Sequence, residues 1–110
     1  MMVDDIGAAF EMDEIAYELR DHIAGLSPGG MSYAFSYIRS FSSQKTRVVA
    51  AADSLDGALS GAVIRTAHRR GLVALAAMAR ETAKGDAERA VRDGFDGLWA
   101  SHPDQVAGVA

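Results

Sequence analysis

The sequence predicts an all-α protein, a single-domain bundle of four or five helices. Four segments carry apolar residues at helical spacing, whereas only one alternates in the manner of a strand. A chain of 110 residues is long enough to bury one core, and its lack of cysteine rules out disulfides. We expect a helical bundle domain over 1–102 and a flexible C-terminal tail over 103–110, because the tail lacks apolar periodicity.

Residues 4–26 are predicted to form one amphipathic helix. Asp4 and Asp5 favour its amino-terminal end through the helix dipole, and the run Ser27-Pro28-Gly29-Gly30 is expected to end it. The apolar stripe recurs at spacings of three and four and consists of Ala9, Met12, Ala16, Leu19, Ile23 and Leu26.

Two structures fit the aromatic segment 31–41. Its alternation and its content of Tyr and Phe favour a strand, whereas Met31, Phe35 and Ile38 also form a helical stripe. Since no second convincing strand is found to pair with it, a short helix is the favoured prediction. The alternative is an extended segment that pairs with another chain or with a twofold copy of itself.

The aromatic segment is also the predicted interaction surface, because it holds four of the eight aromatic residues. On a helix, Tyr33 and Phe35 would point about 160° apart, so some aromatic surface must face away from the core. We expect this surface to be buried against a protein partner or a second copy, as in a homodimer. Trp99 suits a core anchor or the same interface. The predicted interface residues are Tyr33, Phe35, Tyr37, Phe41 and Trp99.

A long helical pattern runs from Ser43 toward Arg70, and Gly71 suits its C-cap. Gly57 and Gly61 lie four residues apart on one of its faces. They indicate either the close approach of another backbone or a break after Asp56, and close packing is the favoured prediction.

Two more helices are expected after Gly71. Residues 72–84 are apolar nearly all round at first, which predicts a central helix that Gly85 closes. Asp86 suits the N-cap of a last helix. The expected buried face of that helix consists of Val91, Phe95, Leu98 and Trp99.

Charge and composition make several partners improbable. The net charge of −4 makes nucleic acid a poor partner. The N-terminus has acids where a signal peptide needs bases, and the longest apolar run, 72–79, is too short to span a bilayer. The sequence therefore predicts a cytoplasmic protein that binds neither nucleic acid nor membrane.

No motif for enzyme chemistry or a cofactor is found. No serine lies in a Gly-x-Ser-x-Gly context, and neither a Walker loop nor a Rossmann glycine pattern is present. One side of the first predicted helix carries four possible metal ligands, Glu11, Glu14, Glu18 and His22. A metal site in a helical bundle needs ligands from several helices, and only Glu81 and His68 could supply them from other segments. This pattern predicts a solvated acidic face, with no metal site and no cofactor.

His68 is the candidate phosphoacceptor. It lies opposite the apolar stripe of its helix, and Arg65 and Arg69 flank it, so an exposed imidazole would stand near cations that offset a phosphoryl charge. The stretch from Gly71 to Asp86 resembles the segment after the active histidine of histidine phosphotransfer domains, over about a quarter of the chain. The His-x-x-Lys-Gly motif of that family has no intact copy here, and His68-Arg69-Arg70-Gly71 is one residue short.

Two functions therefore remain from the sequence. The favoured one is a small, non-enzymatic regulatory protein that acts through a protein–protein interface, because catalytic motifs are missing while aromatic residues are abundant. The alternative is a phosphorelay module that uses His68, or a degenerate relative of the phosphotransfer fold without the histidine motif.

Overall fold

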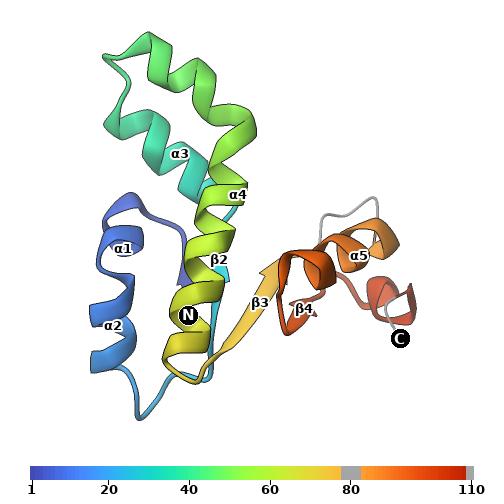
Figure 1. The fold of residues 1–110 in the computed structure, drawn as a ribbon. Coiled ribbons are helices and arrows are strands. Elements are labelled where there is room, and N and C mark those ends of the chain that lie inside the picture. Colours follow the sequence, from blue (N-terminus) through green and yellow to red (C-terminus); the bar gives the residue numbers. More distant parts are fainter. Residues whose placement is uncertain (78–82, 109–110) are drawn as a thin grey trace.

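A four-stranded parallel sheet forms the centre of the computed structural model, which describes residues 1–77 and 83–108 (Figure 1). The spatial order of the strands is β1-β2-β3-β4, and each pair of neighbours is parallel. The strands are β1 (Met2–Val3), β2 (Gly25–Pro28), β3 (Val73–Ala77) and β4 (Gly97–Trp99).

Helices connect each strand to the next. The helices are α1 (Ile6–Phe10), α2 (Met12–Glu18), α3 (Met31–Ser40), α4 (Lys45–Arg69) and α5 (Ala83–Asp93), and a 3-10 helix, η1 (Pro103–Gly108), follows β4. Such crossovers are required because parallel strands cannot be joined by a tight hairpin. In Figure 1, α3 and the first half of α4 extend together beyond the end of the sheet. Among the described residues, no helix is long and apolar enough to cross a membrane.

The prediction of an all-α bundle is wrong, because the fold is α/β. The clearest error lies in 72–84, where β3 stands in place of the predicted central helix. The five residues of β3, Val-Ala-Leu-Ala-Ala, are mostly strong helix formers. Pairing with β2 and β4 makes this segment a strand, and short local patterns do not reveal such pairing. Residues 78–82 of the predicted helix lie outside the described part of the chain.

The single helix predicted over 4–26 is also wrong. Two short helices, α1 and α2, share a break at Glu11, and the chain then enters β2. Leu26, which was assigned to the helical stripe, is fully buried within β2. Asp5 is the N-cap of the short helix α1, because its carboxylate accepts a hydrogen bond from the amide of Gly7.

Two helices agree with their predictions. The aromatic segment is helical over Met31–Ser40, and the long pattern is helical over Lys45–Arg69 without a break after Asp56. Gly71 follows with a φ of +68°, as expected of a residue just after a helix. In the described part of the chain, a β-carbon added at Gly57 would meet nothing within 4 Å, so no backbone packs closely there.

The last helix is shorter than its predicted apolar face requires. α5 ends at Asp93, and Gly94 takes a φ of +97°. The predicted buried face is wrong because Phe95 lies beyond the helix, Leu98 and Trp99 belong to β4, and Val91 is 75% exposed. Asp86 is not the N-cap either, because α5 already begins at Ala83.

The division into a domain over 1–102 and a flexible tail over 103–110 stays a prediction. In the described part of this tail, Pro103–Gly108 forms η1. Gln105 is buried and its side-chain oxygen accepts a hydrogen bond from the backbone amide of Ser101 at 2.9 Å.

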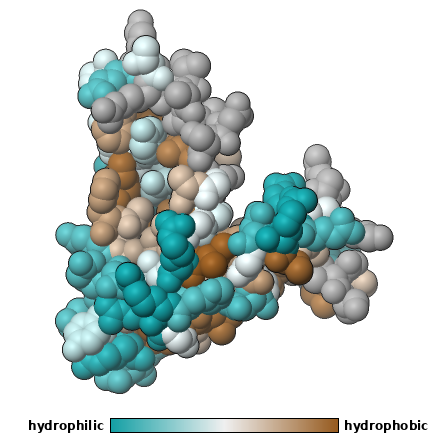
Figure 2. All heavy atoms as spheres, in the orientation of Figure 1, coloured by the Kyte–Doolittle hydropathy of each residue, from teal (hydrophilic) through white to brown (hydrophobic). Residues whose placement is uncertain are grey.

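The hydrophobic core lies between the sheet and α4. Alternate strand residues face this helix, and Val3, Leu26 and Ala74 are completely buried there. The helices contribute Met12, Leu59, Val63 and Ala67. In Figure 2, apolar atoms also show over β3, between the hydrophilic side chains of neighbouring helices.

Candidate functional site

Acidic and glycine residues follow the first two strands at the same edge of the sheet. Asp4 and Asp5 come directly after β1, and Gly29 and Gly30 come directly after β2. Since the strands are parallel, their carboxyl ends meet at this edge, where ligands bind in open α/β sheets. The candidate site therefore lies at this carboxyl edge.

A cavity of about 470 Å³ opens there between the end of β1 and one face of α3. We call it the carboxyl-edge pocket, and its lining consists of Asp4, Asp5, Met31, Ser32, Phe35, Ser36 and Arg39. Five of the seven lining side chains are polar or charged, so the pocket suits a polar ligand rather than an apolar one.

Asp5 holds one wall of the pocket together. The hydroxyl of Ser36 donates a hydrogen bond of 2.8 Å to one carboxylate oxygen of Asp5, and the amide of Gly7 donates one of 2.7 Å to the other. These hydrogen bonds, Ser36 first, lower the pKa of Asp5, and the positive charge of Arg39 lowers it further. Asp5 is therefore an ionised structural carboxylate that ties the start of α1 to α3.

Asp4 and Arg39 leave their charged groups open to a ligand. Among residues 1–77 and 83–108, neither side chain forms a hydrogen bond or a close ion pair. A carboxylate in such a place can accept a proton or hold a cation, and a guanidinium can bind a carboxylate ligand through two hydrogen bonds. Besides the hydrogen-bonded carboxylate of Asp5, the pocket thus presents one open group of each charge.

Gly29 allows β1 and β2 to end close together. A β-carbon at Gly29 would lie 2.4 Å from Cα of Asp4 and 2.6 Å from the carbonyl oxygen of Val3, so no larger residue fits. Gly30 takes a φ of +49° and leads directly into α3. Both glycines therefore bring the amino terminus of α3 next to Asp4.

A second hollow, of about 290 Å³, lies between the carboxyl ends of β2 and β3 and the helices α4 and α5. Pro28 and Ala77 line its sheet side, and Ser60 lines its α4 side. Asp86 of α5 is buried in its wall, 3.4 Å from the guanidinium of Arg89. The carboxyl edge therefore carries two adjacent hollows.

His68, the predicted phosphoacceptor, lies at the opposite edge. It is exposed as expected, but its Nε2 lies 2.9 Å from Oδ2 of Asp96, which also accepts the backbone amide of Ala74 at 2.8 Å. The amide of Ala74 first, and His68 second, lower the pKa of Asp96. Asp96 precedes β4, and Ala74 lies near the start of β3. The hydrogen bond between Asp96 and Ala74 therefore links the amino ends of these two strands.

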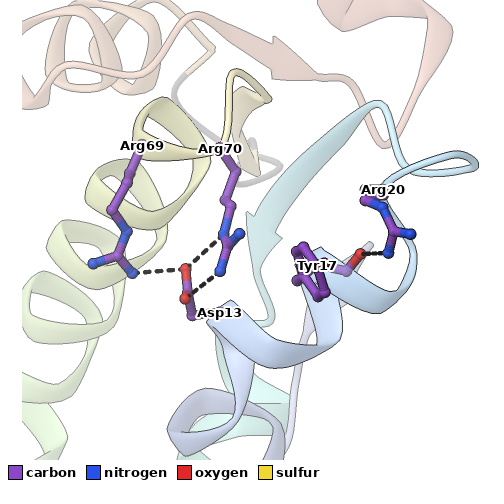
Figure 3. A network of polar contacts seen from close by, with 5 residues as sticks. All are labelled: Asp13, Tyr17, Arg20, Arg69 and Arg70. Carbon is purple, nitrogen blue, oxygen red and sulfur yellow. Dashed lines mark hydrogen bonds and ion pairs between the residues drawn. The ribbon is translucent and has the colours of Figure 1, made fainter.

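The basic cluster next to His68 is engaged in ion pairs. Arg69 and Arg70 both bind Asp13 of α2, at 2.7 Å and 2.5 Å (Figure 3). The guanidinium of Arg70 also lies 5.2 Å from the ring centre of Tyr17, and that of Arg20 lies 4.6 Å from the same centre. Arg69 and Arg70 therefore join the end of α4 to α2, whereas Arg20 contacts α2 alone.

The aromatic residues of the predicted interface lie in two places. Tyr33 packs against the core, whereas Phe35 is 67% exposed and lines the carboxyl-edge pocket. The ring centres of Tyr37 and Phe41 lie 4.7 Å apart, so the two rings pack against each other. Trp99 lies in β4 and its indole donates a hydrogen bond to Ser27. An interface role for these five residues stays a prediction.

The acidic face predicted in the first segment is solvated. Glu11, Glu14, Glu18 and His22 are all exposed. In the described ranges, no three His, Asp or Glu side chains come together in a way that could hold a metal ion.

The carboxyl-edge pocket is not apparent from the sequence, because Asp4 and Asp5 also suit the start of a helix. An apolar run, Met1 to Val3, followed by two acids was the available signal for a strand that ends at a site. The glycines after Leu26 were interpreted as a helix stop, although they also fit a turn from a strand into a helix.

Comparison with known proteins agrees with the parallel sheet. The sequence profile of the family described as malate synthase, TIM barrel domain, matches residues 1–110. The chain belongs to the malate synthase TIM-barrel domain family. It is 36% identical to the glyoxysomal malate synthase of Gossypium hirsutum, 34% identical to the malate synthase of Streptomyces clavuligerus and 36% identical to that of Dictyostelium discoideum.

These alignments with malate synthases cover 94–96% of the chain and 22–24% of each relative. The chain therefore spans less than a quarter of the length of these relatives. Eight parallel strands form a TIM barrel, and four of them would make half of one.

Membership in the malate synthase family overturns the functional interpretation of the sequence. The relatives are named as enzymes, so a non-enzymatic regulatory protein and a histidine phosphotransfer module are both wrong. Missing catalytic motifs and abundant aromatic residues suggested the first interpretation, and His68 beside arginines suggested the second; neither took account of the parallel sheet. The catalytic part of a barrel enzyme need not carry a short sequence motif, because its groups come from the ends of several strands.

Proposed function

We propose that this chain forms part of the catalytic barrel of a malate synthase and that its carboxyl-edge pocket binds a carboxylate group of malate. The position of the pocket carries the proposal. It lies at the carboxyl ends of parallel strands, the face at which TIM-barrel enzymes hold their active sites. The family match over the whole chain supports the same assignment.

Arg39 and Asp4 have different roles in this proposal. Malate is a dicarboxylate, and the guanidinium of Arg39 would bind one of its carboxylates through charge-assisted hydrogen bonds. Asp4 would accept a hydrogen bond from the malate hydroxyl. The amino terminus of α3 lies beside the pocket, and the positive end of its helix dipole would favour a bound anion.

The formation of malate would need further groups, because each strand of a barrel contributes its own residues to the site. The chain spans less than a quarter of its relatives, so we assign to it a share of substrate binding rather than the complete reaction.

Malate binding can be measured by titration of the isotope-labelled chain, followed by NMR. We expect the amide signals of Ser32, Phe35 and Ser36 to shift, because these residues line the pocket. Arg39→Gln should weaken binding about tenfold, since one charge-assisted contact contributes about 1.4 kcal/mol or more.

Arg20→Gln is the matched control for Arg39→Gln. Arg20 is an exposed arginine that donates to the carbonyl of Tyr17 at the end of α2, away from the pocket lining. The Arg20→Gln variant should bind malate with the affinity of the wild type. Signal shifts outside the pocket, or wild-type affinity in Arg39→Gln, would contradict the proposed site.

A cytoplasmic location stays a prediction. Some relatives are named as glyoxysomal, including the protein of Gossypium hirsutum. Imaging of the tagged protein in its own host would distinguish a cytoplasmic from an organellar location.

A further inference from the structure

The hydroxyl group of Ser36 on α3 makes two hydrogen bonds to the turn after β1. It donates one of 2.8 Å to Oδ2 of Asp5, and it accepts one of 3.1 Å from the backbone amide of Ile6. Ile6 is the first residue of α1, and an amide in the first turn of a helix has no partner inside that helix. A hydroxyl combines donor and acceptor on one atom, so no apolar side chain could replace it here.

Each carboxylate oxygen of Asp5 has a different partner. Oδ1 accepts a hydrogen bond of 2.7 Å from the amide of Gly7, and Oδ2 accepts the hydrogen bond from Ser36. The bond to Gly7 caps α1 and holds the carboxylate in place. Ser36 therefore determines what Oδ2 of this fixed carboxylate contacts.

Arg39 stands close to the same carboxylate without contacting it. Arg39 follows Ser36 by three residues, so the two side chains lie on one side of α3, and both line the carboxyl-edge pocket with Asp5. The hydrogen bonds from Ser36 and Gly7 lower the pKa of Asp5 most, and the positive charge of Arg39 lowers it as well. Of the described side chains, none forms a hydrogen bond or a close ion pair with Arg39.

We propose that Ser36 is a positioning residue that occupies Oδ2 of Asp5 and so keeps the guanidinium of Arg39 free for a carboxylate ligand. Without the hydroxyl, Oδ2 loses its donor, and the long, exposed side chain of Arg39 pairs with it. That ion pair uses the same guanidinium donors that a bound carboxylate needs. The inference rests on the proposed function, in which Arg39 binds a carboxylate of malate.

The malate titration followed by NMR tests this role. Ser36→Ala should raise the dissociation constant of malate about fivefold, because malate must displace an exposed ion pair from Arg39. Ser40→Ala is the matched control. Ser40 also lies on α3 and donates a hydrogen bond of 2.9 Å to the carbonyl of Ser36, but it lies outside the pocket lining. The control variant should keep the affinity of the wild type.

Removal of the competing charge distinguishes positioning from a purely structural role. The double variant with Ser36→Ala and Asp5→Asn should bind malate within about twofold of the wild type, because an uncharged Asn forms no ion pair with Arg39. Asn also caps a helix about as well as Asp does. Wild-type affinity in Ser36→Ala, or a double variant as weak as Ser36→Ala, would overturn the proposal. Ser36→Cys, with its weak thiol donor, replaces Ser36→Ala if that variant fails to fold.

The Nε–H signal of Arg39 tests the inference without malate. We expect its exchange with water to slow in Ser36→Ala and to return to the wild-type rate in the double variant, because the ion pair with Asp5 forms only in the former. Equal exchange rates in the wild type and Ser36→Ala would overturn the role of Ser36. A wild type that does not bind malate would contradict the proposed function, and the exchange rates would still decide whether Ser36 keeps Arg39 free.

Discussion

Asp13 joins two parts of the chain that lie more than fifty residues apart. Its carboxylate receives hydrogen bonds from Arg69 and from both Nε and Nη2 of Arg70 (Figure 3). The hydrogen bond from Arg70, assisted by Arg69, lowers the pKa of Asp13 from 3.8 to about 2. This network holds α2 against the end of α4.

The low pKa of Asp13 predicts how stability depends on pH. Because the pKa is lower in the folded state, the ion pairs stabilise the fold above about pH 4, and this contribution is lost as pH falls from there toward 2. Asp13→Asn should therefore lower the urea midpoint at pH 6, and its difference from the wild type should shrink toward pH 2.

Asp21→Asn is the control for this pH profile. In the part of the chain that the structure describes, Asp21 forms no ion pair or hydrogen bond. Its urea midpoint should follow that of the wild type at every pH. A difference between Asp13→Asn and the wild type that stays constant down to pH 2 would contradict the assigned role of Asp13.

At the scale of the element, the turn from β2 into α3 positions the candidate site. Gly29 packs against the backbone of Val3 and Asp4, and its amide donates a hydrogen bond of 2.7 Å to the carbonyl of Val3. The turn therefore fixes where Asp4 stands relative to α3, and this position determines the carboxyl-edge pocket.

Gly29→Ala should lower the free energy of unfolding by about 1–3 kcal/mol, because the added methyl group meets backbone atoms that cannot move aside. Urea denaturation followed by circular dichroism measures this loss. Gly57→Ala is the matched substitution inside α4, where nothing described lies within 4 Å of the added carbon. It should raise stability by up to about 1 kcal/mol. Equal effects of the two substitutions would argue against a close contact at Gly29.

Helix prediction succeeded in α3 and α4 and failed in β3. The segment of α4 carries apolar residues at helical spacing, so its local sequence contains the signal. The α3 segment also fits a strand, and a helix was favoured there because no strand partner was found. The β3 segment has the composition of a helix, and only its hydrogen bonds to β2 and β4 make it a strand. The candidate site could not be predicted without the strands, because the sheet brings Asp4, at the end of β1, next to the residues of α3.

At the scale of the whole molecule, one layer of helices protects one face of the sheet. The core between them is small, and Leu26 is its largest completely buried side chain. Alanine makes up much of the remaining core, so few side chains can compensate for the loss of a large one.

Leu26→Ala should therefore lower the free energy of unfolding by about 2–5 kcal/mol. Thermal and urea denaturation at neutral pH measure this loss. Val91→Ala is the control, because Val91 lies on the exposed face of α5, and it should change stability by less than about 0.5 kcal/mol. A small effect of Leu26→Ala would contradict a core centred between β2 and α4.

The sequence by itself determined the helix α4 and the exposed His68, and it favoured a helix for α3. Each depends on residues a few positions apart, whose spacing places them on one side of a helix. Only the tertiary structure decided the parallel sheet, the pairing of Asp13 with Arg69 and Arg70, and the carboxyl-edge pocket. These features join residues distant in the chain, and their strands have two to five residues each, too few for periodicity to reveal.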